Sequence, residues 1–336
     1  MARAQRFIVT PEQAGLRLDQ FLAATGSVSR TRARALLAAG SVYVEHKRTK
    51  VASRPMFAGQ VVELFDVVLT TEAPPVLPVL YQDEALVVVH KPVGMPVQPA
   101  RESDQLCVTT SLSKQLHIPV QELRVVHRLD TETSGVVAVA LTRPAAADLS
   151  QQLAEHRAQR RYLALSVGTA EVGERLEHFL TSPVPQTRGP ARVLARPAVG
   201  EPLEDERLAR AFCRRISQAE GYSLLQVTLE TGRTHQIRAQ LSAVGLPLLG
   251  DLRYDAPQLP SDWRGGGIGL HAAALTLRHP SSRQELEIHA PLPEAFQQWL
   301  QAHQLWTAAL QPDGAGKLPC FIQESRNGED QPQACS

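Results

Sequence analysis

The sequence predicts an α+β fold in which a small basic α/β module precedes a larger, strand-rich body. Residues 1–66 hold ten Lys/Arg and five Asp/Glu, a net charge of +5, whereas the whole chain of 336 residues has a net charge of +1. Residues 67–79 contain Pro74, Pro75 and Pro78, which favour an extended spacer. From residue 80 onward, short apolar runs of strand type alternate with helical patterns.

These observations predict four segments. They are a module at 1–66, a linker at 67–79, a body at 80–307, and a polar, irregular tail at 308–336 that we expect to be disordered. The 43% hydrophobic and 21% charged content is that of an ordinary globular protein. The apolar runs are too short to span a bilayer, and the first residues lack the apolar stretch of a secretory signal. We therefore expect a cytoplasmic protein with no membrane partner.

The four cysteines are scattered along the chain and include no C-x-x-C pair. A disulfide scaffold or a structural zinc site is therefore not expected. The two histidines near the polar motifs described below, His127 and His235, have no cysteine or acidic partners at ligand spacing, so structural hydrogen bonding is the expected role for both.

The basic module reads as two helices and short strands. Leu18, Phe21 and Leu22 form one apolar helical stripe, and a second helix follows Ser29 and stops at Gly40. Alternating valines after Gly40 and the run "QVVELF" predict strands.

Three arginines, Arg30, Arg32 and Arg34, lie on the second predicted helix. Because Arg30 and Arg34 are four residues apart, they project from one face. This pattern is typical of a nucleic-acid contact, but also of a merely solvated surface.

The body contains three polar motifs next to predicted elements. "HRLDTETSG" at 127–135 lies between predicted strands at 123–126 and 136–141, which places Asp130 on a connecting loop. An Asx-turn is the ordinary role of such an aspartate. A glycosidase-like pair with Glu132 is a weaker reading, since residues two apart need not face each other.

The other two motifs follow later in the chain. "GRTHQIR" at 232–238 follows a predicted strand at 222–230 and begins a helix, so Arg233 and Arg238 could form an anion site or a solvated helix start. Tyr162 follows two arginines on another predicted strand, where a core role is the commoner one.

Taken together, these motifs resemble known families. "RLDQFLA" and "SRTRARALLAAGSVYVE" resemble the ribosomal S-four-type RNA-binding domain. "HRLDTETSG", "RRY" and "TGRTHQIRAQL", supported by "HKPVGMPV", "GLPLLGDLRYD" and "LHAAALTLRHP", resemble the pseudouridine synthases of the large-subunit ribosomal RNA type. The resemblance covers roughly residues 16–300, and the stretch 171–215 follows the family pattern poorly.

The resemblance implies a largely antiparallel mixed sheet flanked by helices and loops, and an isomerase that converts uridine to pseudouridine. Asp130 would be the nucleophile, Arg238 its charged partner, and Tyr162 a base-stacking residue that assists proton removal. Further residues would contact the substrate. Arg128 would enter the gap left by the flipped base or hold a phosphate, and Ile237 would line the apolar wall of the pocket. Arg233 would also bind the substrate, and the RNA backbone would be bound by Arg30, Arg32 and Arg34.

The expected partner is RNA, most directly large-subunit ribosomal RNA, bound by a monomer that needs no metal or organic cofactor. Alternatives stay open: a transfer RNA substrate, a non-catalytic ribosome-assembly factor that keeps the fold, or a nucleosidase built on Asp130.

Overall fold

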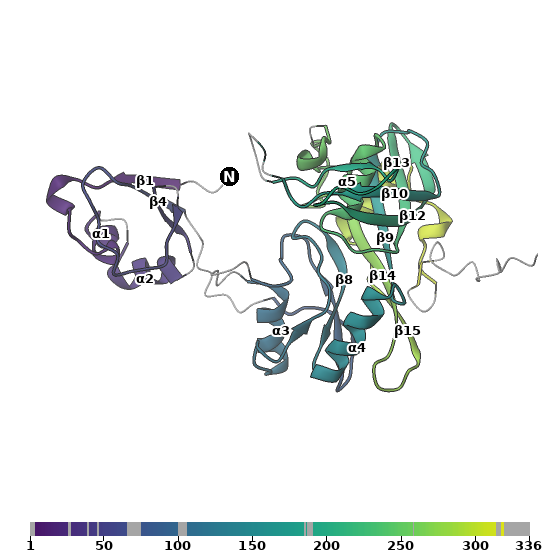
Figure 1. Cartoon of the computed structure of the whole chain (residues 1–336), viewed down its shortest axis with the longest axis horizontal. Coiled ribbons are helices and arrows are strands. Elements are labelled where there is room, and N and C mark those ends of the chain that lie inside the picture. The colour runs from purple at the N-terminus through teal and green to yellow at the C-terminus, as the bar shows by residue number, and fades with distance from the viewer. Residues whose placement is uncertain are drawn as a thin grey trace, which may run out of the picture. The chain divides into compact units, whose positions relative to one another are not determined.

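A computed structural model describes residues 4–25, 28–38, 40–45, 47–65, 75–99, 106–184, 186, 191–257, 259–313 and 317–318. The chain divides into two compact units, one formed by Met1–Val76 and Gln98–Leu116 and the other by Leu77–Val97 and His117–Ser336 (Figure 1). Most of the predicted linker falls outside the described residues, so its bounds stay a prediction.

The first unit is built on an antiparallel sheet of four strands in the order β1-β4-β2-β3. The strands are β1 (Ala4–Ile8), β2 (Val42–Val44), β3 (Lys47–Arg48) and β4 (Val61–Phe65). The other elements are η1 (Pro11–Gln13), α1 (Leu18–Ala24), α2 (Arg30–Ala38) and α3 (Val108–Leu116). Apolar residues of α1 and α2 share one core with those of β2 and β4, which confirms the predicted helices and strands; β1 and α3 were not predicted.

The second unit is built on one large sheet in the order β11-β10-β12-β13-β9-β14-β8-β6-β5, with β15 beside β14 and β7 beside β8. Its strands are β5 (Val79–Gln82), β6 (Leu86–Lys91), β7 (Arg124–Val125), β8 (Ser134–Ala140), β9 (Gln159–Val167), β10 (Arg175–Leu180), β11 (Ala195–Pro197), β12 (Arg207–Ala219), β13 (Tyr222–Leu229), β14 (Leu270–Arg278) and β15 (Glu285–His289). Every pair is antiparallel except β14 with β8. The predicted α+β fold with a largely antiparallel mixed sheet is confirmed.

The helices of this unit are α4 (Arg143–Ala154), η2 (Leu252–Tyr254), α5 (Gln236–Ala243), α6 (Glu294–Ala302) and η3 (Ala308–Leu310). All seven residues of β8 are buried, because β8 lies inside the sheet and α4 packs against it (Figure 1). One apolar cluster joins β6, β8 and α4, and a second joins β9 and β13 to α6. The sheet is therefore a rigid base for the loops at its strand ends.

Two regions differ from expectation. The stretch 171–215 contains β10, β11 and most of the 13-residue β12, in which Ala209, Ala211 and Cys213 are buried at alternate positions. A small residue at every second position is a strand signal in the sequence, but none of the family motifs lies in this stretch, so no strand is predicted there.

The expected disorder from residue 308 is wrong for its first part, because Leu310 and Leu318 are buried in the core beside α6. Residues 319–336 lie outside the described residues.

Across the described ranges, the chain has no helix that is both long and apolar enough to cross a bilayer.

Candidate active site

Asp130 lies on the loop between β7 and β8, as predicted, with 28% of its side chain exposed. The loop is held where it enters β8. The hydroxyl of Ser134 bonds Nδ1 of the buried His271 at 2.8 Å. Gly135 has φ +122°, and a Cβ there would lie 2.1 Å from the carbonyl oxygen of Ala272 on β14. Only glycine lets the two strands meet so closely, so this end of the motif fixes the loop to the sheet.

Lys91 connects the loop that follows β6, which contains Pro92 and Met95, to the Asp130 loop. Its side chain is fully buried, and its ammonium donates to the carbonyls of Pro92 at 2.9 Å, Met95 at 2.7 Å and Thr131 at 3.3 Å. Burial lowers the pKa of Lys91 to about 8, although the charge of Asp130 acts in the opposite direction. The lysine thus fixes the residue after Asp130, which is a role the sequence did not assign.

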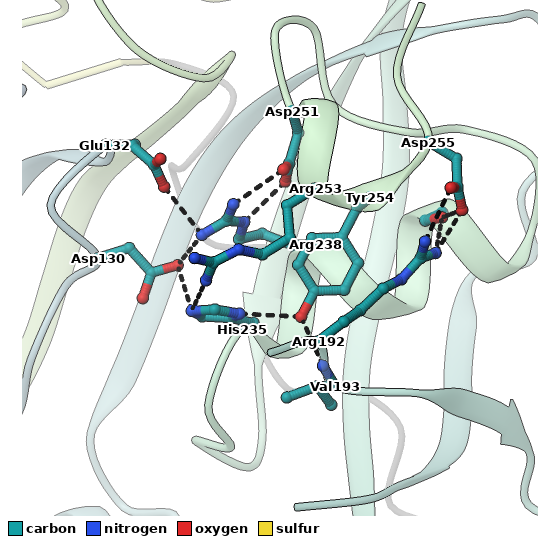
Figure 2. Close-up of polar contacts among 11 residues, drawn as sticks. Asp130, Glu132, Arg192, Val193, His235, Arg238, Asp251, Arg253, Tyr254 and Asp255 are labelled. Atoms are coloured by element: carbon teal, nitrogen blue, oxygen red, sulfur yellow. Dashed lines mark hydrogen bonds and ion pairs between the residues drawn. The ribbon is translucent and has the colours of Figure 1, made fainter. Parts of the chain in front are cut away.

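Arg238 of α5 is the charged centre of the site (Figure 2). It is 2% exposed, and its Nε and Nη2 donate to the two oxygens of the buried Asp251 at 2.7 and 2.8 Å. Its Nη1 donates to Oδ2 of Asp130 at 2.9 Å and lies 3.0 Å from Oε2 of Glu132. Burial opposes the charge of Arg238, but the bonds and charges of Asp251 and Asp130 outweigh it and raise the pKa of the guanidinium. Asp130 and Arg238 are thereby brought together.

His235 faces the same oxygen of Asp130 as Arg238 does. Its Nε2 is 3.9 Å from Oδ2 of Asp130 and 3.4 Å from Nη1 of Arg253, and its Nδ1 is 2.9 Å from the hydroxyl of Tyr254 (Figure 2). His235 has the left-handed backbone φ of +51° just before α5, a conformation that costs free energy outside glycine and asparagine. Burial lowers the pKa of His235, so the ring is neutral near pH 7. His127, in contrast, accepts the Ala138 N–H at 3.0 Å, the structural bond expected of it.

Tyr162 and Ile237, two further predicted site residues, are both buried. Tyr162 on β9 is 6% exposed; burial raises the pKa of its phenol, the Arg160 charge opposes this, and the Asp130 charge adds to it. The ring is therefore within electrostatic reach of Asp130. Ile237 is 5% exposed on α5. Their roles in the reaction stay predictions.

Two of the arginines predicted to contact RNA are exposed, and the side chain of a third is not described. Arg128 and Arg233 are exposed, and Nε of Arg233 donates to the carbonyl of Leu208 at 3.2 Å. The side chain of Arg32 lies outside the described residues. Their contacts with RNA stay predictions.

In the first unit, Asp19 organises the arginines. Its carboxylate is fully buried and accepts bonds from Nε of Arg17 at 3.2 Å, of Arg30 at 3.2 Å and of Arg34 at 2.8 Å. Burial raises the pKa of Asp19, but the three arginines outweigh that effect and lower it to about 2. Arg30 and Arg34 therefore do share one face, as predicted, but they are ion-paired rather than freely solvated.

Sequence reasoning missed Asp251, Tyr254, Lys91, Arg17 and Asp19. Asp251 and Tyr254 belong to "GLPLLGDLRYD", and Lys91 to "HKPVGMPV"; both stretches support the family resemblance, but neither assigns a role to these three residues. A buried Asp–Arg or Lys–carbonyl contact leaves no local periodicity, and only the folded chain brings the partners together. Among the described residues, no group of three or more His, Cys, Asp or Glu side chains is arranged to hold a metal ion.

A loop-borne carboxylate held by a buried arginine, in a chain that begins with an arginine-bearing module, fits the class of RNA-modifying enzymes. Residues 85–243 match the family model of RNA pseudouridylate synthases, and residues 16–62 match the S4 domain. The chain is 30% identical over 314 residues to ribosomal large subunit pseudouridine synthase D of Haemophilus influenzae, covering 88% of this chain and 93% of that protein. It is 33% identical over 305 residues to the protein of the same name from Nitrosomonas europaea, covering 86% and 85%.

The solved structure of human RNA pseudouridylate synthase domain containing 4 matches with a TM-score of 0.55 and 25% identity, over 68% of this chain and 94% of that one. This chain belongs to the RNA pseudouridine synthase family. It is an isomerase with an N-terminal S4 domain, and RNA is its partner.

Proposed function

We propose that this protein converts specific uridines of large-subunit ribosomal RNA to pseudouridine in the cytoplasm, with Asp130 as the nucleophile. The observation that carries the site assignment is the 2.9 Å bond from the buried Arg238 to Oδ2 of the loop-borne Asp130. The choice of RNA rests on the relatives named above, which are called ribosomal large subunit enzymes.

The proposed chemistry follows from which oxygen of Asp130 is held. Arg238 binds Oδ2 and His235 faces the same atom, so Oδ1 is the oxygen directed to the substrate. A carboxylate attacks only when charged, and a fixed guanidinium both stabilises that charge and sets its direction. The reaction breaks the N1–C1′ bond and forms the C5–C1′ bond; C5 loses a proton and N1 gains one. No electrons are gained or lost overall, so the reaction requires no redox cofactor.

The remaining predicted residues act around this carboxylate. The target uridine must leave its stack, at a cost of about a few kcal/mol. Tyr162 stacks on the flipped base and assists loss of the C5 proton, and Ile237 forms the apolar wall. The exposed Arg128 and Arg233 enter the gap that the flipped base leaves in the RNA stack, or bind the neighbouring phosphates.

The N-terminal module contributes affinity rather than chemistry. We propose that residues 1–66 form the RNA-binding module, residues 67–79 a linker and residues 80–307 the catalytic body. We also propose that the protein works as a monomer without a metal. Arg30, Arg32 and Arg34 contact RNA phosphates, so binding weakens steeply as salt rises.

The first test is pseudouridine mapping in total RNA from cells with and without the gene. Loss of one or a few sites in large-subunit ribosomal RNA is the expected result. Loss at a transfer RNA position would keep the enzyme but overturn the substrate. Retention of every site, with redundant enzymes removed, would favour a non-catalytic assembly factor.

The second test is the purified Asp130→Asn variant on a large-subunit ribosomal RNA transcript. We expect activity to fall at least about 1,000-fold, because an amide cannot replace the attacking carboxylate. Asp205→Asn is the matched control, because Asp205 is exposed between β11 and β12. Full activity of Asp130→Asn would show that the nucleophile is another residue.

A further inference from the structure

The hydroxyl of Tyr254 determines which nitrogen of His235 carries a proton. Tyr254 is fully buried, and its oxygen has two polar neighbours among the described residues: the backbone N–H of Val193 at 3.0 Å and Nδ1 of His235 at 2.9 Å. The Val193 N–H can only donate, so the tyrosine oxygen accepts that bond. The tyrosine O–H then has Nδ1 as its acceptor. With Nδ1 accepting, the proton of the neutral ring resides on Nε2.

The other tautomer is disfavoured by the same accounting. If Nδ1 carried the proton, the tyrosine oxygen would accept two bonds and its own hydrogen would be buried without an acceptor. The 3.4 Å contact from Arg253 to Nε2 would fit that tautomer, but it is long, and Arg253 is only half-buried and can turn to solvent. The fully buried Tyr254 therefore outweighs it.

With this tautomer, the Nε2–H of His235 faces Oδ2 of Asp130, the oxygen that Arg238 already holds. The separation of 3.9 Å is too long for a hydrogen bond, but catalytic hydrogen bonds are often long without substrate and tighten when it binds. We infer that His235 is a positioning residue for the reaction: held by Tyr254, it presents Nε2–H as a second donor to Oδ2 of Asp130. This inference rests on the proposed role of Asp130.

Tyr254 is itself held on several sides. The guanidinium carbons of Arg192 and Arg238 lie 5.0 and 5.1 Å from its ring centroid, which is cation–π distance. Arg192 also forms an ion pair with Asp255, next to Tyr254 in sequence (Figure 2). The stretch 171–215, which follows the family pattern poorly, therefore supplies two of the residues that hold Tyr254, Arg192 and Val193.

The test that needs no RNA is the imidazole ¹⁵N spectrum of the full chain at neutral pH. We expect Nδ1 of His235 to give the signal of an unprotonated nitrogen, assigned by its loss in His235→Gln. Tyr254→Phe keeps the ring but removes the hydroxyl, so it should shift His235 toward the Nδ1–H tautomer that Arg253 favours. If wild-type His235 is Nδ1–H, or if Tyr254→Phe leaves its tautomer unchanged, the inference is wrong.

The kinetic test uses steady-state assays on the RNA that the wild-type enzyme modifies. His235→Ala and Tyr254→Phe should each lower kcat about tenfold or more with KM little changed, because the first removes the donor to the charged Asp130 and the second removes the group that orients it. His235→Gln places an amide N–H near the Nε2 position and should recover part of the loss. Tyr222→Phe is the matched control: it also removes a tyrosine hydroxyl, but the ring of Tyr222 packs against Trp299, at 4.9 Å between ring centroids.

Wild-type kcat in a folded His235→Ala variant would overturn the inference, as would a His235→Gln variant no better than His235→Ala. These results differ from failure of the proposed function. In that case the wild-type enzyme itself would make no pseudouridine, while the tautomer experiment would still read out the His235–Tyr254 contact.

Discussion

Asp19 in the first unit and Arg238 in the second are buried charges that each hold three partners of opposite sign. Asp19 is one anion bound to three arginines whose side chains are 43–54% exposed. Arg238 is one cation bound to three carboxylates, of which Asp251 is 1% exposed, Asp130 28% and Glu132 50%. In each cluster the buried centre fixes the direction of partners that reach solvent.

The difference lies in the sign of the surplus. The Asp19 cluster leaves excess positive charge at the surface, which suits RNA phosphates. The Arg238 cluster leaves excess negative charge, which is shared by Asp130 and Glu132. Asp251, which is buried and binds Arg238 through both of its oxygens, is the anchor that makes the second arrangement rigid. In our proposal, the same arrangement of charges serves RNA binding in one unit and catalysis in the other.

Among changes to the clusters compared above, the largest effect should come from removing the centre of the second cluster. Arg238→Gln leaves Asp251 buried without its cation and Asp130 without its donor. We expect activity to fall about 100-fold or more and unfolding free energy to fall by about 3–5 kcal/mol. Activity assays and denaturant unfolding would measure the two. Arg264→Gln, at an exposed arginine, is the control; an Arg238→Gln variant with near-normal activity would separate Arg238 from the chemistry.

Removing the centre of the first cluster should have a smaller and less intuitive effect. Asp19→Asn raises the net positive charge by one, yet we expect RNA affinity to fall several-fold because the three arginines lose their common partner. Fluorescence anisotropy of a labelled stem-loop RNA, at two salt concentrations, would measure it on the full chain.

The matched control for Asp19→Asn is Glu12→Gln, which makes the same charge change at an exposed residue. If Asp19→Asn bound RNA as tightly as Glu12→Gln, total charge rather than arginine placement would set the affinity.

The smallest effect should come from a third cluster with no fully buried centre. His303 stacks on Trp299 at 3.9 Å and bonds Glu220 at 2.7 Å and Asp262 at 2.8 Å. Burial lowers the pKa of His303, but its bonds to Asp262 and Glu220 outweigh this and raise it above the ordinary 6.5. Because the folded-state pKa is the higher one, the stabilisation is complete below about pH 6.5 and is lost as pH rises through the raised pKa.

We therefore expect the Tm advantage of the wild type over His303→Gln to be larger at pH 6 than at pH 8.5, by about 2 °C, because both carboxylates are about half exposed. Thermal unfolding at the two pH values would measure it. An advantage that grew with pH would mean that the two carboxylates do not stabilise protonated His303.

Much of this protein follows from local sequence. The polar run between two apolar strands places Asp130 on a loop, the strand–turn–helix pattern around Gly232 places Arg238 on α5, and the helix with Arg30 and Arg34 four apart puts both on one face. These features depend on side-chain periodicity and turn chemistry within a few residues, which a sequence displays directly. The motifs also sufficed to indicate the family.

Only the tertiary structure decided which residues complete each cluster. Asp130 and Arg238 are 108 positions apart, and their 2.9 Å bond depends on where β8 lies in the sheet and where α5 packs against β10 and β11 of the same sheet. Tyr254, His235 and Val193 meet from three separate segments. Such contacts depend on strand register and on the balance of buried donors and acceptors, and neither quantity is encoded in any short stretch of the chain.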